Sequence, residues 1–326
     1  MRGMDDRYLV TGSSGCIGAW AIRRLIDESA SVVALDVSDD DHRLRLLLDT
    51  AELDALPRVR ADIRVLSELE QVLAQHRISH VVHLAALQVP FCQADPVLGA
   101  EVNVVGTVNL LEAVRRSEGQ VRGVSYASSV AVFGRTEMYE DGVATDDSPL
   151  APLTLYGVYK QANEGTARLY AEDYGVGSIG LRPCIVYGPG RDQGMTSDPT
   201  RAIVAALAGR PSHIAFGGSS TFQHADDAAA AFISAARAER TDATVANLGG
   251  PSAEIASFVE CIEKAVPEAA GTITHDHDPL ALPSDYDGSG LDTLIGPVAY
   301  RSIADGVAGS VDQFRTLLAD GLVSPD

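Results

Sequence analysis

The hydrophobic and polar positions of this chain alternate between two periods over roughly its first two-thirds. Short apolar runs rich in β-branched residues predict strands at Arg7–Val10, Ser31–Leu35, Val81–Leu84, Val121–Tyr126 and Ser178–Leu181. Patterns of helical period lie between them, at Ile17–Asp27, Val65–His76, Val97–Arg116 and Tyr156–Tyr174. Since short links join the two kinds of segment, this order predicts an α/β fold in which helices cover both faces of a doubly wound parallel sheet.

The pattern changes after about Tyr187, where loops rich in glycine and proline and shorter helices replace the regular alternation. We therefore predict a sheet domain over residues 1–187 and a smaller, partly interleaved C-terminal lobe over residues 188–326. An apolar run at Thr244–Leu248 predicts one further strand that returns to the main sheet.

Composition and charge exclude several classes of protein. The 326 residues include 45 acidic and 25 basic side chains, which gives a net charge of −20. Nucleic acids and anionic membranes both require a basic surface, so we expect neither as a partner. The sequence shows no N-terminal signal peptide and no apolar run of membrane length. The four cysteines are scattered, without a Cys-x-x-Cys pair, which is typical of reduced thiols and predicts a cytoplasmic protein.

The segment after the first strand has glycines at every third position, followed by a helix. Gly12 permits a tight turn, Gly15 lets the backbone approach a pyrophosphate, and Gly18 lets the helix pack closely on the strand. The helix N-terminus also offers amide hydrogens to phosphates. Asp36 ends the second strand, where a carboxylate binds ribose hydroxyls and repels a 2′-phosphate, which favours NAD over NADP. Cys16 lies in the same loop, and we expect the helix N-terminus to lower the pKa of its thiol.

Tyr156 and Lys160 are spaced four residues apart, so they lie on one face of the predicted helix. A phenol titrates near pH 10, and a neighbouring ammonium lowers that pKa, so Tyr156 becomes an acid/base group. The chain uses arginine at nearly every basic position, and Lys160 is one of two lysines. Ser129 follows a predicted strand and can donate a hydrogen bond to the oxygen of a substrate. We predict these three as the catalytic residues.

The motifs occur in an order that resembles the extended short-chain dehydrogenases/reductases of the NAD-dependent epimerase/dehydratase family. The resemblance rests on Thr11–Gly18, Asp36, Asp62, His83–Ala86, Asn103, Gly106-Thr107, Ser128-Ser129, Val132–Gly134, Tyr156, Lys160, Arg182-Pro183, Tyr187–Gly190 and His224–Asp227. It implies a Rossmann-type NAD-binding domain over residues 1–187 and a substrate-binding lobe over most of residues 188–326. It also implies hydride transfer between NAD and a secondary alcohol or ketone of a sugar-like substrate.

The resemblance assigns further residues to the two ligands. Lys160 would hold the nicotinamide ribose, while Asp62 and Ile63 would face the adenine. The residues expected to bind NAD are Gly12, Ser14, Gly15, Cys16, Ile17, Gly18, Asp36, Asp62, Ile63, Leu84, Ala85, Ala86, Asn103, Tyr156, Lys160, Pro183 and Ile185. Those expected to contact the substrate are Leu87, Gln88, Ser128, Ser129, Val130, Arg191, Gln193 and Thr196. Family members also suggest a homodimer through the helices Val97–Arg116 and Tyr156–Tyr174.

Two departures from the family pattern concern the reaction. Dehydratases of the family carry Asp-Glu after the catalytic hydroxyl residue, whereas Val130-Ala131 stands here, which disfavours dehydration. Members that bind nucleotide sugars usually have an arginine four residues before the histidine of the His-x-Asp-Asp motif, and Ser220 occupies that position before His224. A diphosphate would therefore lose a charge-assisted anchor. The first hypothesis is a dehydrogenase of a non-nucleotide, sugar-like alcohol; the alternative is an NAD-dependent (nucleotide-)sugar epimerase with a transient keto intermediate.

Two other segments stay open. Arg191, Gln193 and Thr196 either line the substrate pocket or belong to a loop that simply leads into a helix beginning at Asp198. His275 and His277 would lie on the same side of a strand, but the chemistry of the family needs no metal, and we expect no metal site.

Overall fold

Seven parallel strands form the central sheet of the computed structural model, which describes residues 6–324. In spatial order they are β11 (Ala243–Asn247), β7 (Ser178–Arg182), β5 (Gly123–Ala127), β4 (His80–His83), β1 (Arg7–Thr11), β2 (Ser31–Asp36) and β3 (Arg58–Arg60). β1 and β2 each carry four buried residues in succession, because helices cover both faces of the sheet. This explains why their sequences are continuous apolar runs instead of alternating ones.

The predicted doubly wound α/β fold is confirmed. Strand order reverses at β1, which pairs in parallel with β2 on one side and with β4 on the other. The crossovers leave β1 in opposite directions, so a crevice opens at the carboxyl ends of β1 and β4. The predicted strand at Thr244–Leu248 is confirmed as β11, with bounds Ala243–Asn247, which pairs with β7 at one edge of the sheet. The short strand β3 at the opposite edge was not predicted.

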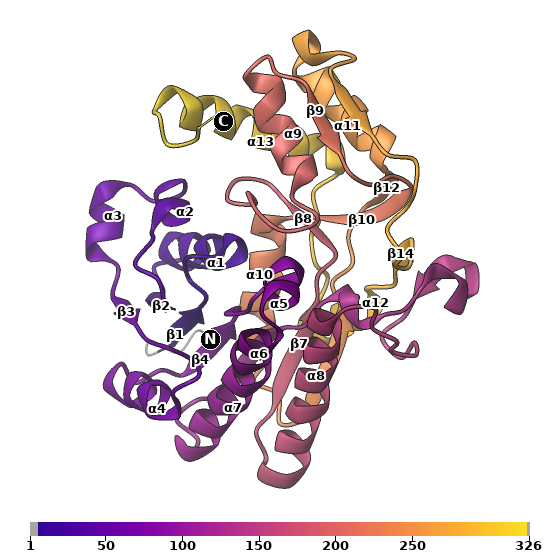
Figure 1. Cartoon of the computed structure of the whole chain (residues 1–326). Helices are drawn as coiled ribbons and strands as arrows, with labels where there is room; N and C mark the ends of the chain where they lie inside the picture. The colour runs from indigo at the N-terminus through magenta and orange to yellow at the C-terminus, as the bar shows by residue number, and fades with distance from the viewer. Residues whose placement is uncertain (1–5, 325–326) are drawn as a thin grey trace.

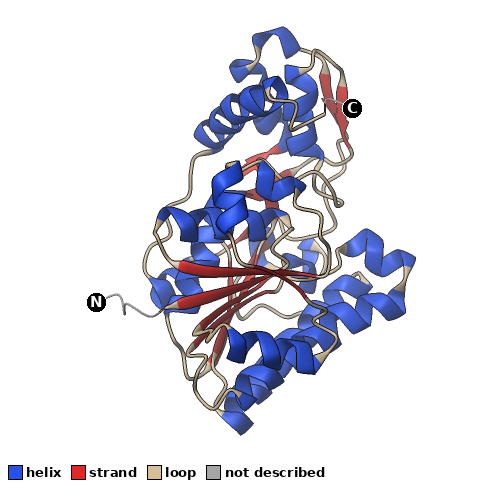
Figure 2. Cartoon of the chain, turned by 90° about the vertical axis from the view of Figure 1, so that its left-hand side faces the viewer, coloured by secondary structure: helices blue, strands red, loops and turns tan. Residues whose placement is uncertain are grey.

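Two helical layers enclose the sheet, as Figures 1 and 2 show from two sides. One layer contains α1 (Cys16–Asp27) and α10 (Ala225–Arg237). The other contains α4 (Leu66–Gln75), α7 (Gly106–Arg116) and α8 (Leu155–Tyr174). The shorter helices of this half are α2 (His42–Arg45), α3 (Thr50–Ala55), α5 (Val89–Ala94) and α6 (Pro96–Ala100).

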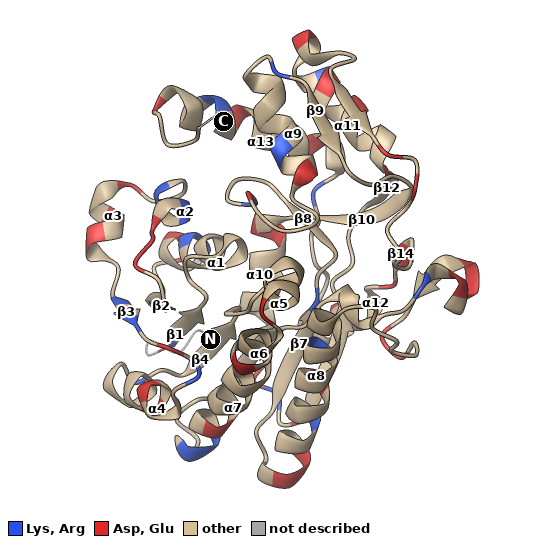
Figure 3. Cartoon of the chain, viewed as in Figure 1, with Lys and Arg blue, Asp and Glu red and all other residues tan. Residues whose placement is uncertain are grey.

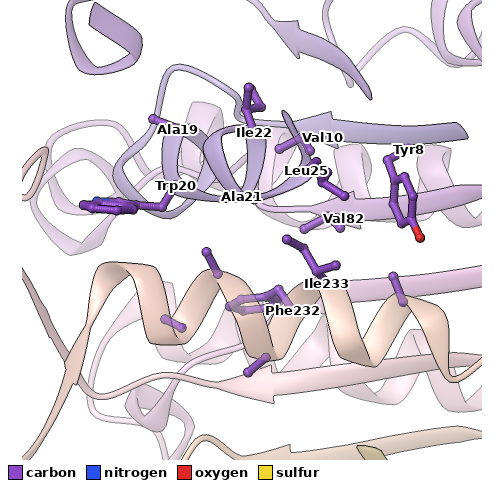
Figure 4. Packing of buried hydrophobic residues seen from close by; sticks show 14 of the residues in the cluster. Tyr8, Val10, Ala19, Trp20, Ala21, Ile22, Leu25, Val82, Phe232 and Ile233 are labelled. Atoms are coloured by element: carbon purple, nitrogen blue, oxygen red, sulfur yellow. The ribbon is translucent and has the colours of Figure 1, made fainter. Parts of the chain in front are cut away.

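The largest hydrophobic core lies between α1, α10 and the sheet. Figure 4 shows Ile22 and Leu25 of α1 together with Phe232 and Ile233 of α10, and all four side chains are almost fully buried. Deleting a large side chain from such a core costs about 2–5 kcal/mol. This packing holds the N-terminus of α1, and with it the glycine-rich loop, against the end of β1.

The second lobe is built around a three-stranded sheet of β12 (Ser252–Glu254), β10 (Ser219–His224) and β8 (Ile185–Tyr187). Its helices are α9 (Asp198–Leu207), α11 (Ile255–Ala265) and α13 (Ile303–Ala319), whereas α12 (Ser289–Ile295) packs against α10 and β11 of the large sheet. Two small sheets pair β9 (Ser212–Ile214) with β13 (Ile273–His275) and β6 (Val143–Ala144) with β14 (Asp285–Tyr286). Tyr187, Phe222 and Phe258 form its aromatic core, with Phe222 and Phe258 stacked at 4.8 Å between ring centroids.

The two parts of the chain interleave. β11 and α10 come from residues 188–326 but pack with the large sheet, whereas β6 comes from the first half and pairs with β14. Division of the chain at residue 187 stays a prediction. Acidic positions are distributed over both lobes in Figure 3, in keeping with the net charge of −20.

One expectation about apolar length is wrong. The continuous helix Pro96–Arg116 consists of α6, a π-helical turn at Glu101–Val105 and α7, and it is long and apolar enough by composition to cross a membrane. Its most apolar stretch is 44% buried within the protein. Because a core helix of a soluble protein meets the same criteria, this single helix is weak evidence for a membrane span.

Candidate active site

A cavity of about 730 Å³ lies at the carboxyl ends of β1, β2, β4 and β5 and is also lined by the loop that follows β8. Every residue predicted to contact NAD or the substrate lines this cavity, with the exception of Asn103. Residues drawn from positions 12 to 196 of the chain therefore meet in one place, which is the crevice expected from the reversal of strand order.

The glycine-rich loop forms one end of the cavity, which we call the phosphate end. Gly12 has φ +68°, and a Cβ on it would lie 2.6 Å from the backbone nitrogen of Ala85. A Cβ on Gly18 would lie 2.2 Å from the carbonyl oxygen of Gly12. Neither position tolerates a side chain, so α1 starts directly against the end of β1 with its amide groups directed at the cavity.

Asp36 ends β2 beside this loop. Its Oδ2 accepts a hydrogen bond from the backbone N–H of Ser14 at 3.0 Å, and its Oδ1 accepts one from Ser38 at 3.1 Å. The two backbone groups fix the carboxylate at the cavity wall. The expectation of a lowered pKa for Cys16 is wrong, because burial raises the pKa of its thiol to about 12.

The wall farther along the sheet contains Asp62, Ile63, Ala85 and Ala86. Arg64 neutralises Asp62 through Nε and Nη2, at 2.6–3.1 Å from the carboxylate oxygens. This part of the wall therefore offers apolar surface and a compensated charge, which suits a flat heterocycle.

Asn103 lies in the π-helical turn, is 1% exposed and does not reach the cavity. Its amide nitrogen donates to the carbonyl oxygens of Leu87 and Gly99, at 3.1 and 2.9 Å, and lies 3.2 Å from Sγ of Cys92. In this structure the side chain fastens the loop at Leu87, which lines the cavity, and the direct contact between Asn103 and NAD stays a prediction.

The opposite end of the cavity, which we call the reaction end, holds the three predicted catalytic residues. Thr154 caps α8 by accepting a hydrogen bond from the N–H of Gly157 at 3.1 Å. A Cβ on Gly157 would lie 2.1 Å from the carbonyl oxygen of Ala131, so α8 abuts the turn that follows Ser129. This close approach places Tyr156 within hydrogen-bonding reach of Ser129.

Lys160 is 3% exposed, and its Nζ donates to the carbonyl oxygen of Ala127 at 2.7 Å. The ammonium also lies 5.5 Å from the centre of the Tyr156 ring. Burial lowers the pKa of Lys160 to about 8, although the nearby Cys92 and Glu164 oppose that change. A group near its titration point is suited to exchanging a proton at neutral pH.

Burial also raises the pKa of Tyr156 above its usual value. The nearby hydroxyl of Ser129 and the positive charge of Arg191 act in the opposite direction and lower the pKa. This differs from the expectation that Lys160 would be the main group lowering the pKa of the phenol. The ammonium of Lys160 lies near the ring of Tyr156. In the protein without a bound cofactor, Arg191 is the cation that lowers the pKa of the phenol.

A buried ion pair that the sequence did not reveal supports the reaction end. Glu164 and Arg182 form two hydrogen bonds of 2.8 Å, and their side chains are 6% and 4% exposed. Oε1 of Glu164 also accepts a hydrogen bond of 2.5 Å from the hydroxyl of Ser128. Glu164 follows Lys160 by four residues on α8, so the spacing that identified Tyr156 and Lys160 also extends to Glu164.

Other residues of the cavity lie on segments that the sequence did not connect with it. Arg43 donates to the carbonyl oxygen of Ser14 at 2.9 Å and to Oδ1 of Asp192 at 2.6 Å, and His42 lies 3.0 Å from the same carboxylate. This group closes over the phosphate end. Leu280 and Leu282 come from the loop before β14, and no pattern in the sequence signals their approach.

Arg191 and Thr196, predicted on the substrate side, are joined by a hydrogen bond of 3.0 Å between Nη2 and Oγ1. Both line the cavity together with Gln88 and Gln193. The loop after β8 thus belongs to the cavity wall, and α9 begins after it at Asp198, as predicted. The described residues 6–324 contain no group of three or more histidine, cysteine, aspartate or glutamate side chains able to hold a metal.

Comparison with known proteins identifies the family. A model described as the NAD dependent epimerase/dehydratase family matches residues 8–249. The chain belongs to this family. Its members are extended short-chain dehydrogenases/reductases, and the chain is an NAD-dependent enzyme of this type.

Several relatives are similar along almost their whole length. UDP-glucose 4-epimerase of Mycolicibacterium smegmatis is 31% identical over 322 residues, which cover 95% of this chain and 98% of that protein. A solved structure of Thermus thermophilus UDP-glucose 4-epimerase with NAD has a TM-score of 0.80 at 26% identity, covering 95% and 99% of the two chains. MoeE5 in complex with UDP-glucuronic acid and NAD has a TM-score of 0.76 at 28% identity, covering 96% and 99%.

The residues of the cavity fit NAD. A Cβ on Gly12 or Gly18 would collide with the backbone, so only glycine lets the loop and the start of α1 lie this close to β1 and β4, and Asp36 offers carboxylate oxygens at the carboxyl end of β2. A 2′-phosphate would meet the negative charge of Asp36. The cofactor expected from the sequence is confirmed by the family and by the NAD complexes among its solved members.

Proposed function

We propose that this enzyme oxidises a secondary alcohol of a sugar-like substrate that carries no nucleotide, and that it releases the ketone. The observation that carries the proposal concerns the second lobe. Among the described residues that follow Thr196 in the sequence, Leu280 and Leu282 are the two that line the cavity. Ser220, at the position of the family arginine, is 4% exposed and lies near the thiol of Cys184. A diphosphate would find no charge-assisted partner on this wall.

In the proposed reaction, Tyr156 is the general base. Its phenolate takes the proton of the substrate hydroxyl, and Ser129 hydrogen-bonds the same oxygen as the carbonyl develops. NAD, when bound, accepts the hydride from the carbinol carbon. Lys160 would hold the nicotinamide ribose and keep a positive charge beside the Tyr156 ring.

The remaining predicted contacts follow from the same arrangement. Gly12, Gly15 and Gly18 would cradle the pyrophosphate, and Asp36 would bind the adenosine ribose. Leu87, Gln88, Ser128, Val130, Arg191, Gln193 and Thr196 would contact the substrate. Their place in the cavity wall supports these roles.

A sugar epimerase is the second candidate, and the names of the similar proteins favour it. The relative from M. smegmatis is described as a UDP-glucose 4-epimerase. In that reaction the keto intermediate would turn within the cavity and take the hydride back. Retention of NAD between turnovers would suit the group that closes over the phosphate end.

Absorbance of NADH separates the two candidates. We expect net NADH formation when the purified enzyme and NAD meet a panel of free sugars, sugar acids and polyols, and none with UDP-sugars. Tyr156→Phe should lower kcat by about 10²–10⁴-fold, because the base is lost. Tyr174→Phe, at the exposed C-terminal end of the same helix, is the matched control and should retain full activity.

A changed stereocentre in a recovered UDP-sugar, without net NADH, would establish the epimerase. It would also show that a cavity wall with Leu280 and Leu282 does not exclude a nucleotide. Full turnover by Tyr156→Phe would contradict the role of the phenol in either reaction.

We also propose a homodimer formed through α8 and the helix Pro96–Arg116. These neighbouring helices expose apolar side chains: Val97 is 70% exposed, Val105 44%, Val158 45% and Leu169 46%. A second copy of the chain would cover them, which also accounts for the apolar composition of this helix. Light scattering after gel filtration should give twice the mass of the chain, and Val97→Arg with Val158→Arg should give the monomer mass. A monomeric wild type would contradict the proposal.

A cytoplasmic location is proposed on the state of the cysteines. Cys16, Cys92, Cys184 and Cys261 are all free thiols in the structure. Burial raises the pKa of Cys16 and of Cys184, so these thiols stay protonated at neutral pH. A reducing compartment suits this set.

A further inference from the structure

Arg191 differs from the other arginines of the cavity wall. Arg43 is paired with Asp192, and Arg64 is paired with Asp62 and Glu101. Arg191 forms no ion pair with the residues that the structure describes. Its hydrogen bond from Nη2 to Thr196 is accompanied by a buried Nε that has no partner. The guanidinium therefore keeps most of its hydrogen-bonding capacity at the cavity.

Gln88 is held beside Arg191 by the backbone of Gly194. Gly194 has φ +99°, and a Cβ on it would lie 2.0 Å from Oε1 of Gln88 and 3.2 Å from Nη2 of Arg191. Oε1 of Gln88 is buried and also has no hydrogen-bond partner. Burying Nε of Arg191 and Oε1 of Gln88 without hydrogen bonds lowers the free energy of unfolding. A ligand that supplies hydrogen-bond partners for these side chains would restore it.

This pair lies next to the reacting centre. The charge of Arg191 acts on the phenol of Tyr156, and Arg191, Thr196 and Tyr156 line the same cavity. Leu280 and Leu282 also line the cavity, and Leu282 packs against the hydrophobic cluster that contains Val130. The reaction end therefore presents one guanidinium without an ion-pair partner, neutral hydrogen-bonding groups beside it and apolar surface from two leucines.

We propose that Arg191, with Thr196 beside it, binds a carboxylate of the substrate while Oε1 of Gln88 accepts a hydrogen bond from a substrate hydroxyl, and that the substrate is a polyhydroxylated monocarboxylic acid. The proposal rests on the dehydrogenase function proposed above and names its substrate class. A planar guanidinium matches a carboxylate, whose single charge one arginine balances, whereas a phosphate ester carries nearly two charges. The hydroxy acid and NAD⁺ give the oxo acid, NADH and one proton: the C–H pair of electrons passes to NAD⁺, and the O–H proton passes to Tyr156.

Matched acids and polyols test the charge directly. Four- to six-carbon aldonates and the alditols of the same chain length and configuration are compared as substrates of the NAD-loaded enzyme, with NADH absorbance as readout. We expect kcat/KM for the preferred aldonate to exceed that for its alditol by at least about 100-fold, which corresponds to one buried charge-assisted pair. Equal values for an acid and its alditol would overturn the proposal.

Arg191→Met tests the residue. We expect KM for the aldonate to rise by at least about 30-fold and the difference between aldonate and alditol to disappear. The Kd for NAD, measured by fluorescence titration, should change less than about threefold, because Arg191 is assigned to the substrate. Arg201→Met, an exposed arginine ten residues along the chain whose side chain is 69% exposed, is the control and should leave both constants unchanged. A large rise in the Kd for NAD with unchanged discrimination would assign Arg191 to the cofactor and overturn the proposal.

Binding to Tyr156→Phe loaded with NAD separates this inference from the dehydrogenase proposal. If aldonates bind this variant by calorimetry and alditols do not, the carboxylate site stands even where no substrate of the panel is oxidised. If aldonates neither bind nor react, the carboxylate site is refuted. Net oxidation of a neutral sugar at a rate independent of Arg191 would refute it and leave the dehydrogenase intact.

Discussion

The phosphate end and the reaction end of the cavity satisfy their polar groups in different ways. At the phosphate end, Asp36 accepts two backbone hydrogen bonds and Arg43 is paired with Asp192. At the reaction end, Arg191 and Gln88 keep buried polar atoms without partners, and burial shifts the pKa values of both Tyr156 and Lys160. The charged side chains of the phosphate end are paired before a ligand arrives, whereas polar side-chain atoms at the reaction end are not.

This difference follows from what each end has to bind. The family shares one cofactor, so a rigid cradle of glycines and paired charges serves every member. Substrates vary, and selectivity requires groups whose hydrogen bonds are completed only by the correct ligand. Substitutions at the phosphate end should therefore alter the Kd for NAD. Substitutions at the reaction end should alter turnover and the free energy of unfolding.

The largest effect is expected from Glu164→Gln, which tests whether the reaction end depends on its buried ion pair. Arg182 would keep its charge at 4% exposure without its ion-pair partner, and the loss of one partner of a buried pair costs about 3–5 kcal/mol of unfolding free energy. Urea denaturation measures it. Glu172→Gln on the same helix removes an exposed partner of Arg168 and should cost no more than about 0.5 kcal/mol. Equal losses for the two variants would show that Glu164 does not support the site.

Gly18→Ala should act on the phosphate end alone. Its Cβ would lie 2.2 Å from the carbonyl oxygen of Gly12, so the loop must shift and its amide groups turn away from the phosphates. We expect the Kd for NAD to rise at least about 100-fold, or roughly 2.7 kcal/mol. Gly309→Ala on α13 meets no atom within 4 Å and should instead stabilise the protein by about 0.5–1 kcal/mol. An unchanged Kd for NAD in Gly18→Ala would contradict the proposal that the glycine-rich loop binds the cofactor.

Much of the phosphate end could be predicted from the sequence, because its glycines and Asp36 lie within one strand–loop–helix–strand segment. Tyr156 and Lys160 could be predicted for the same reason, since one helix carries both. Leu280 and Leu282 could not, because they depend on how the second lobe folds back over the sheet. The pKa of Cys16 was predicted in the wrong direction: burial raises it, and the helix N-terminus does not overcome that effect.

Asn103 shows the other limit of reading residues from a family pattern. The pattern predicts a contact with NAD, whereas in the structure the buried side chain donates hydrogen bonds to the carbonyl oxygens of Leu87 and Gly99 and is not among the residues that line the cavity. A motif in the sequence predicts that a residue lies near a site. The direction in which the side chain of Asn103 points depends on the π-helical turn that contains it.

Lys160→Met tests the burial of charge at the reaction end through pH. Burial lowers the folded-state pKa to about 8, below the value of about 10.4 in an unfolded chain. Between these values the unfolded state binds more protons, so the unfolding free energy rises with pH. Between pH 7.5 and 10, the wild type without added NAD should gain about 1–3 kcal/mol relative to the variant. Chemical denaturation at each pH measures the difference, and parallel curves for the two proteins would place the lysine in solvent.

The smallest effect is expected where the two ends of the cavity meet. Asp192 follows Arg191 in the loop after β8, yet its carboxylate pairs with Arg43 above the phosphate end. Burial raises the pKa of Asp192, but hydrogen bonds from Arg43 and His42 outweigh it and lower the pKa overall, so the pair is intact at neutral pH. Asp192→Asn removes the charge and keeps the shape.

Since the carboxylate is 45% exposed, solvent screens the pair, and its loss should cost at most about 1 kcal/mol. The dissociation rate of NAD should rise about two- to fivefold, because the loop must open for the cofactor to leave. Stopped-flow fluorescence with NADH measures the rate, and Asp312→Asn, which removes an exposed partner of Arg315, is the control. A rise in KM for the substrate at a constant rate of cofactor release would mean that this loop serves the reaction end alone. Asp192 would then belong to the reaction end together with Arg191.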